Sequence, residues 1–138
     1  RPIDSLIAKI LEKEENAMEI GQSQEDYLEA IYLLHQSGVA VKNCSLAKKM
    51  GKSKPSVTVA VQTLEQKGYL EKLDHGILRL TEKGESLAIR INERHNFFHA
   101  YFTSIGLSEE EAQKNACAIE HVLSETCYQK MKAALTQS

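Results

Sequence analysis

The sequence contains no long run of uncharged apolar residues. A helix that spans a bilayer needs about 20 consecutive, mostly apolar residues, and charged side chains interrupt every apolar stretch before that length. No signal-peptide pattern opens the chain either. Cysteine is scarce, and an odd set of three in 138 residues suits a reduced cytoplasmic protein better than a disulfide-stabilised one. We therefore expect a cytoplasmic protein without membrane segments.

The usual features of large multidomain proteins and of enzymes are missing as well. The chain has no internal repeat, low-complexity tract or long linker, and its length allows one hydrophobic core with room for a small second one. It also carries no recognisable nucleophile motif or phosphate-binding loop. We therefore do not expect an enzyme.

Charge is unevenly distributed along the chain. The net charge is only −2, yet residues 42–67 contain six lysines and a single acidic residue, Glu65. A basic segment inside an otherwise acidic chain is the electrostatic pattern of a surface that binds a polyanion. On charge alone, the alternative is a solvated lysine-rich surface.

Apolar residues recur at helical spacing along the first half of the chain. The predicted helices are an amphipathic one over residues 3–19, one from Ser23 to Ser37, a short one over residues 45–50 that ends at Gly51, and one that opens at Ser53. After Gly68, residues 69–73 and 77–80 have the pattern of two strands around a turn. Two short helices joined by a glycine turn and followed by a hairpin predict a winged helix-turn-helix.

The second half of the chain has a helical pattern. Thr81 caps a long predicted helix that reaches about Ile105, and a capping box at Ser108 opens another that we expect to continue to Ser124, where a last helix begins. The predicted fold class is therefore mainly α, with an N-terminal winged helix-turn-helix domain followed by an all-helical domain. The expected divisions are an N-terminal helix at 1–22, a DNA-binding domain at 23–90 and a helical domain at 91–138.

The start of the helix at Ser53 is the candidate DNA-reading element. In a helix-turn-helix, the first turn of the second helix meets base edges while nearby cations hold phosphates. The candidates for base edges are Ser53, Pro55, Ser56, Thr58 and Gln62, with Pro55 suited to a thymine methyl, and those for phosphates are Lys48, Lys49, Lys52 and Lys54. Residues 53–59 include no Arg or Asn, so specificity should depend on DNA shape and on a second copy. Alternatively, winged helices bind proteins, and such hydroxyls often only cap a helix.

A second candidate site combines several metal-ligand types. Cys117, Glu120 and His121 stand at i, i+3 and i+4, which places them on one face of the helix expected there. His95 and His99 are also four residues apart in the preceding helix. Taken singly, each has a simpler explanation as a buried cysteine, a solvated glutamate or a hydrogen-bonded histidine. Together they predict a bound divalent metal ion.

Several segments resemble the diphtheria-toxin-repressor family of iron- and manganese-dependent transcriptional repressors, in its short two-domain form. They are residues 24–32, 54–58, 68–70, 80–84, 94–95 and 116–124, and the similarity covers about residues 23–135 in order. The resemblance implies a dimeric winged-helix repressor whose affinity for double-stranded operator DNA is switched on by Fe(II) or Mn(II). The helical domain at 91–138 would then bind metal and dimerise.

The resemblance also implies two metal sites. A primary site would use Asp26 with Cys117, Glu120 and His121, and an ancillary site would use the set His95, His99, Gln113 and Glu29. The family usually has a carboxylate at the position of His99, and its iron-type members have a histidine at that of Gln113. Asp26 matches the manganese branch, whereas Cys117 matches the iron branch. Because thiolates favour Fe(II), Co(II), Ni(II) and Zn(II) over Mn(II), we expect Fe(II) ahead of Mn(II) as the activating ion, with the other ions able to substitute.

The ligand positions suggest how metal would act. Asp26 precedes the helix-turn-helix and the other ligands follow it, so a shared ion would fix the angle between the two halves. A homodimer is expected because the aromatic residues at 97, 98, 101 and 102 exceed what two helices bury, although they could also pack internally. Two rival functions are a winged-helix regulator that senses a small organic ligand and a redox sensor that uses Cys117 and Cys127.

Overall fold

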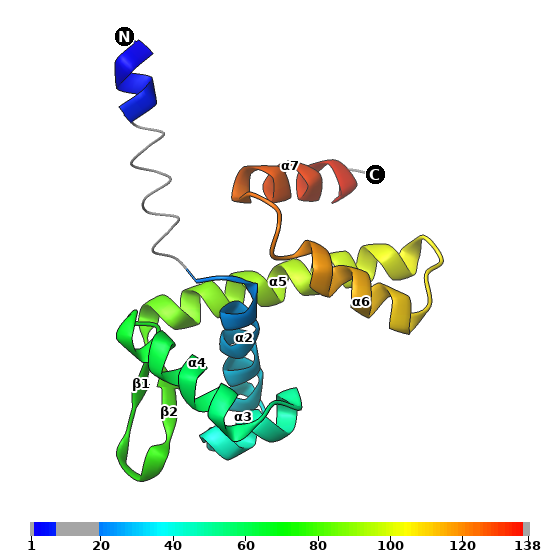
Figure 1. The fold of residues 1–138 in the computed structure, drawn as a ribbon. Coiled ribbons are helices and arrows are strands. Elements are labelled where there is room, and N and C mark those ends of the chain that lie inside the picture. Colours follow the sequence, from blue (N-terminus) through cyan, green and yellow to red (C-terminus); the bar gives the residue numbers. More distant parts are fainter. Residues whose placement is uncertain (1, 8–19, 137–138) are drawn as a thin grey trace.

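The computed structural model describes residues 2–7 and 20–136 (Figure 1). Residues 2–7 are helical, and the rest of the helix predicted at 3–19 lies outside the described residues. The other elements are α2 (Gln22–Gln36), α3 (Asn43–Met50), α4 (Lys54–Gln66), β1 (Leu70–Lys72), a 3-10 turn (Asp74–Gly76), β2 (Leu78–Leu80), α5 (Glu82–Ser104), α6 (Glu109–Ile119) and α7 (Glu125–Thr136). Within these residues, none of the helices combines the length and apolar character that crossing a bilayer requires.

Helices α2, α3 and α4 and the β1–β2 hairpin share one hydrophobic core. Leu28, Leu46, Val57 and Leu64 are fully buried in it, so each of the three helices contributes to the same interior. The two strands pair antiparallel with Leu70 opposite Leu80. These elements form the predicted winged helix-turn-helix, which confirms this part of the fold class.

Local capping explains where most helices begin. The side-chain oxygens of Ser53, Thr81 and Ser108 each accept a hydrogen bond from the backbone N–H three residues on, as predicted. The prediction was wrong at α2, which begins at Gln22 after Gly21, without a side-chain cap. It was also wrong at α3, because Ser45 is the third residue of this helix and accepts a hydrogen bond from the backbone N–H of Lys42 at 3.3 Å.

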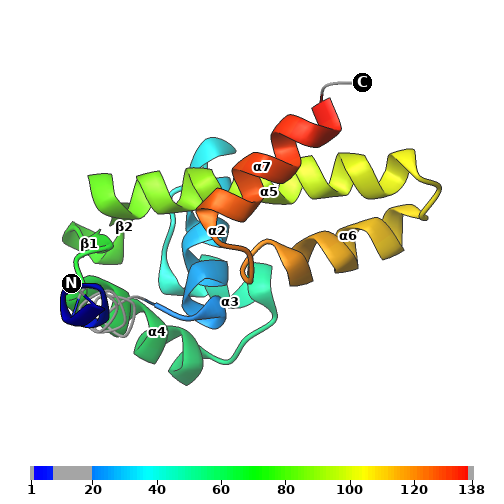
Figure 2. The same ribbon diagram turned by 90° about the horizontal axis from the view of Figure 1, so that it is seen from above.

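Helix α5 connects the winged helix to the C-terminal helices. Figures 1 and 2 show its first half beside α2 and the hairpin, and α6 folded back along its second half. A second buried cluster forms there, in which Phe98 of α5 contacts Ala116 of α6 and Tyr128 of α7. Phe98, one of the aromatic residues expected at the dimer interface, therefore packs within the subunit. The apolar side chains of Ile105 and Val122, by contrast, are 58% and 72% exposed.

The start of α5 approaches the hairpin so closely that only glycine fits. A Cβ built on Gly84 would lie 2.0 Å from the carbonyl oxygen of Tyr69, which accepts a hydrogen bond from the backbone N–H of Thr81 at 3.1 Å. We expect Gly84→Ala to lower the free energy of unfolding by about 3 kcal/mol, because the helix must move off the hairpin. Urea denaturation measures this change. Gly21→Ala is the matched control, since no atom lies within 4 Å of its added Cβ, and an equally small effect at both positions would contradict the expectation.

Candidate metal centre and nucleic-acid interface

A buried arginine shapes the turn that follows α6. The Arg94 side chain is 12% exposed, and its Nη1 donates hydrogen bonds to the carbonyl oxygens of Glu120 at 3.2 Å and Leu123 at 2.7 Å. The guanidinium also lies 5.0 Å from the ring centroid of Tyr128. Because this side chain satisfies the carbonyls, the chain turns after Ile119, and the prediction of a helix up to Ser124 was wrong for its last residues.

Two overlapping groups of possible metal ligands meet at this turn. The first contains His95, Cys117 and Glu120, and one ligand atom from each lies within 4.8 Å of the others. His95 Nδ1 is 2.8 Å from Glu120 Oε2 and 3.7 Å from Cys117 Sγ. On the far side of the ring, His95 Nε2 lies 3.0 Å from Gln113 Oε1. Helices α5 and α6 therefore build this group together.

The second group connects the turn to α2. It contains Asp26, Glu120 and His121, again within 4.8 Å of one another. His121 Nε2 is 2.9 Å from Asp26 Oδ1 and 3.1 Å from Glu120 Oε1, while its Nδ1 is 2.7 Å from Glu25 Oε2. Asp26 and Glu25 come from the winged-helix half, so this group brings together residues about 95 positions apart.

Glu120 belongs to both groups and is only 1% exposed. One of its carboxylate oxygens faces His95 and the other faces His121. The predicted primary set of four is thus divided, with Cys117 beside His95 and Asp26 beside His121. The division follows from the turn, which separates His121 from the helical face that carries Cys117.

The remaining predicted ligands lie around these groups. Glu29 places a carboxylate oxygen in the interior next to them, and His99 stacks on His95 with ring centroids 6.2 Å apart. His99 Nε2 lies 2.8 Å from Oε1 of Glu109, which belongs to neither group. The sequence predictions missed Glu25 and Glu109. Nothing in their spacing marks them, because each meets its histidine through the tertiary fold.

The electrostatics of the centre reflect crowded carboxylates. Burial and the neighbouring Glu120 charge raise the pKa of Glu29 to about 7. Burial alone would lower the pKa of His121, but Asp26, Glu120 and Glu25 together raise it to about 11. Burial likewise opposes the charged form of Glu120, yet His121 and His95 hold its pKa below the ordinary value. Burial and the Glu120 charge raise the pKa of the Cys117 thiol. The site therefore attracts positive charge.

Unsatisfied buried atoms test whether a metal ion fits. Among the described residues, four buried side-chain nitrogen or oxygen atoms lack a partner with hydrogen-bond geometry, and three are Glu29 Oε2, Glu120 Oε1 and His121 Nε2. The two short contacts of His121 Nε2 are thus close enough for ion pairs but poorly aligned for hydrogen bonds. A histidine nitrogen and two carboxylate oxygens without partners, beside the group that holds the Cys117 sulfur, fit a divalent transition-metal ion.

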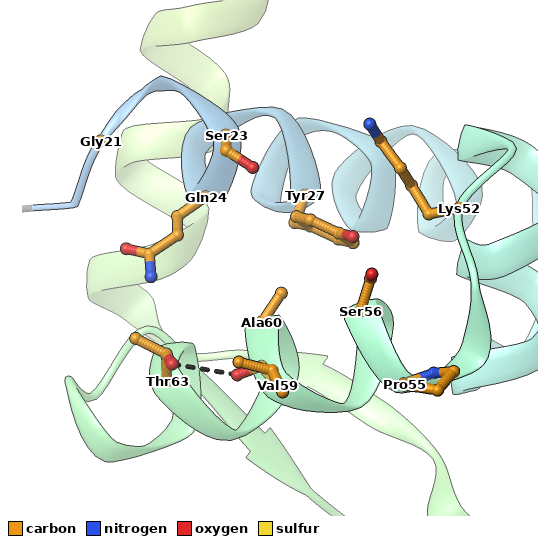
Figure 3. Close-up of a pocket in the computed structure, with 10 residues that line it drawn as sticks. All are labelled: Gly21, Ser23, Gln24, Tyr27, Lys52, Pro55, Ser56, Val59, Ala60 and Thr63. Atoms are coloured by element: carbon orange, nitrogen blue, oxygen red, sulfur yellow. Dashed lines mark hydrogen bonds between the residues drawn. The ribbon is translucent and has the colours of Figure 1, made fainter.

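The candidate DNA-reading residues lie on the surface around the start of α4. All nine are exposed: Lys48, Lys49, Lys52, Ser53, Lys54, Pro55, Ser56, Thr58 and Gln62. A hollow of about 770 Å³ lies between the first turns of α2 and α4. Figure 3 shows the residues that line it. Lys52 and Pro55 line it, and so does Val59, which the sequence predictions left out and which is 63% exposed.

The role of Arg94 in holding the turn leads to a stability prediction. We expect Arg94→Met to lower the free energy of unfolding by about 2 kcal/mol, because two carbonyls lose a charged donor. Amide hydrogen exchange in residues 120–125 should also become faster. Arg90→Met, an exposed arginine one turn earlier on α5, is the control. Equal stability and equal exchange in both variants would show that the turn does not depend on Arg94.

Comparison with known proteins places this geometry in a family. Residues 19–75 match the model of the iron dependent repressor N-terminal DNA binding domain, and residues 81–137 match that of the iron dependent repressor metal binding and dimerisation domain. The iron-dependent repressor IdeR of Mycobacterium tuberculosis is 34% identical over 118 residues, which are 85% of this chain and 51% of IdeR. The chain thus spans about half the length of this relative.

Shorter relatives are covered more completely. The HTH-type transcriptional regulator MntR of Lysinibacillus sphaericus is 36% identical, over 74% of this chain and 73% of MntR. A transcriptional regulator of Methanocaldococcus jannaschii is 33% identical, over 82% of this chain and 92% of its own length. Among solved structures, the manganese regulator SloR aligns with a TM-score of 0.74 and 26% identity, over 83% of this chain and 54% of SloR. The chain belongs to the iron-dependent repressor family, which includes the diphtheria toxin repressor.

Proposed function

We propose that this protein is a cytoplasmic, metal-dependent transcriptional repressor of metal-ion homeostasis and has no enzymatic role. It binds double-stranded operator DNA as a homodimer, and Fe(II) or Mn(II) activates it. The observation that carries the proposal is the 2.9 Å approach of His121 Nε2 to Asp26 Oδ1, because it joins the C-terminal helices to the helix that precedes the helix-turn-helix. The proposed domains are 23–90 for DNA binding and 91–138 for metal binding and dimerisation.

The proposed metal ligands are the two groups that share Glu120. Asp26 and His121 would serve one side of Glu120, and His95 and Cys117 the other. Glu29 would supply a further oxygen. Gln113 and His99 lie at the edge of the site, where Gln113 contacts His95 and His99 contacts Glu109. When bound, a divalent ion supplies positive charge among the carboxylates and a strong connection between α2 and the turn after α6.

Charge on His121 provides that connection when metal is absent. With its pKa raised to about 11, the imidazole carries a proton at neutral pH and attracts Asp26, Glu120 and Glu25. A metal ligand must instead offer a lone pair, so this proton leaves when His121 ligates. The same carboxylates therefore face protonated His121 in the metal-free state and the ion in the metal-bound state. The two states differ in how strongly the positive charge attracts these carboxylates.

The identity of the ion follows from the mixed donor set. Relatives are named as iron-dependent repressors and as manganese regulators, and ScaR, a structural neighbour at 25% identity, has been solved with bound Zn2+. Carboxylates suit Mn(II), whereas the Cys117 sulfur favours Fe(II), Co(II), Ni(II) and Zn(II). We infer Fe(II) or Mn(II) as the physiological activator, with the other ions able to substitute.

The DNA side of the proposal depends on exposed lysines. Lys48 and Lys49 lie in the last turn of α3, and Lys52 and Lys54 flank the start of α4. None of the four takes part in an ion pair within the described residues, so their ammonium groups remain available for phosphates. A homodimer would present two such surfaces to two half-sites of one operator.

Metal-dependent DNA binding is the direct test. A duplex is first selected from a random-sequence library with Mn(II), and its affinity is then measured by fluorescence anisotropy with Fe(II), Mn(II), Zn(II) or a chelator. We expect metal to raise the affinity at least 100-fold, which corresponds to about 2.7 kcal/mol of coupling. His121→Ala should lose this activation while keeping its helical circular dichroism. His35→Ala, an exposed histidine at the end of α2, should behave as wild type.

Two results would redirect the proposal. Equal DNA affinity with every metal and with the chelator would remove the metal switch and favour a regulator that senses an organic ligand. Binding that survives the chelator but is lost with peroxide would favour a redox sensor.

The position of Cys117 leads to a prediction about metal preference. We expect Cys117→Ser to weaken Co(II) binding at least tenfold and to leave Mn(II) binding within about threefold, because only the softer ion gains much from sulfur. Isothermal titration calorimetry gives both affinities, and the thiolate-to-Co(II) absorption band should disappear. Cys127→Ser is the control, since this exposed cysteine is in neither ligand group. A Co(II) affinity unchanged by Cys117→Ser would exclude this thiol as a ligand.

A further inference from the structure

Val59 is an exposed apolar residue on the proposed recognition helix. It is 63% exposed, whereas the residues of α4 that join the core are Val57, Ala60, Val61 and Leu64. Valine is a weaker helix former than the lysine or glutamine that commonly occupy exposed helix positions. Nothing in the packing of α4 therefore accounts for a branched apolar side chain at this position.

The neighbours of Val59 form a short apolar strip. Pro55 precedes it by one helical turn, and both side chains line the hollow beside α4 in Figure 3. The nearest hydroxyl groups are engaged locally, because Thr63 Oγ1 donates to the carbonyl oxygen of Val59 at 2.9 Å and Ser56 Oγ accepts from Ser53 Oγ at 2.9 Å. The strip therefore offers shape and apolar surface more than hydrogen bonds.

Charge indicates which partner this strip meets. Lys52 lines the same hollow, and Lys54 begins the same helix. A peptide without negative charge would gain little from these lysines, whereas the major groove of DNA presents base edges between two rows of phosphates. Thymine alone carries a methyl group on its major-groove edge. An apolar strip flanked by cations therefore complements a thymine-containing site.

We propose that Val59 is a specificity-determining residue that selects thymine through its 5-methyl group, next to a second thymine contact at Pro55. This inference rests on the proposed DNA-binding function and adds the base that α4 prefers. Residues four apart on a helix rise by roughly 6 Å, and successive bases on a strand are separated by about 3.4 Å. The two side chains thus match thymines one or two steps apart, so the operator half-site should contain closely spaced thymines.

Uracil substitution isolates the proposed contact. In the duplex selected by wild-type protein with Mn(II), each thymine is replaced in turn by uracil, which removes only the methyl group. We expect one such replacement to weaken wild-type binding three- to tenfold. Val59→Ala should bind the thymine duplex three- to tenfold more weakly than wild type does. It should bind the duplex with uracil at the sensitive position as tightly as it binds the thymine duplex. Val39→Ala is the matched control, an exposed valine in the loop after α2, and should remain sensitive to the methyl group.

The outcomes separate this inference from the function on which it rests. If no duplex is enriched with Mn(II), Fe(II) or Zn(II), the proposed function fails and the inference fails with it. If a duplex is bound but no uracil replacement weakens binding, or if Val59→Ala keeps the full wild-type sensitivity to every replacement, the function stands and the role of Val59 is wrong. Unchanged DNA binding by Val59→Ala would likewise overturn the inference and favour a protein partner for this strip.

Discussion

The geometry of the candidate metal centre depends on the hydrogen bonds that Arg94 makes to the turn after α6. Its guanidinium replaces the helical partners that the carbonyls of Glu120 and Leu123 would otherwise need. Because α6 stops there, Glu120 remains next to the helix and faces α5, while His121 points toward α2. Two residues adjacent in sequence can therefore serve two groups of ligands, and a single buried carboxylate belongs to both.

This arrangement concentrates negative charge that the fold does not neutralise by itself. Asp26, Glu29 and Glu120 lie close enough to influence one another, and the raised pKa of Glu29 reflects both its burial and the charge of Glu120. Burying charged groups is costly unless opposite charge compensates for them. His121 provides part of that compensation. The centre is thus held together by positive charge, and a divalent cation would supply more of it than one proton does.

The sequence predicted what local interactions determine. Ser53, Thr81 and Ser108 fix the starts of their helices by accepting a hydrogen bond from a backbone N–H only three residues away. The winged helix-turn-helix follows from short-range periodicity and glycine turns. The end of α6 could not be predicted, because the responsible side chain, Arg94, is 26 residues away from Glu120. The spacing of Cys117, Glu120 and His121 predicted a single group of ligands. Because the helix ends before His121, the fold instead places Cys117 and His121 in two different groups that share Glu120. The exposure of Val59 likewise depends on which face of α4 the core occupies.

Helix α2 is the element through which the two candidate sites can influence each other. Ser23 and Gln24 line the hollow beside α4, while the next two residues, Glu25 and Asp26, meet His121 on the other side. The two surfaces are therefore separated by less than one helical turn of the same rigid element. Since closely packed cores deform little, a displacement of Asp26 would carry the first turn of α2 with it. That movement would change the width of the hollow next to Val59, so the metal centre and the DNA-reading surface would be coupled without any intervening segment.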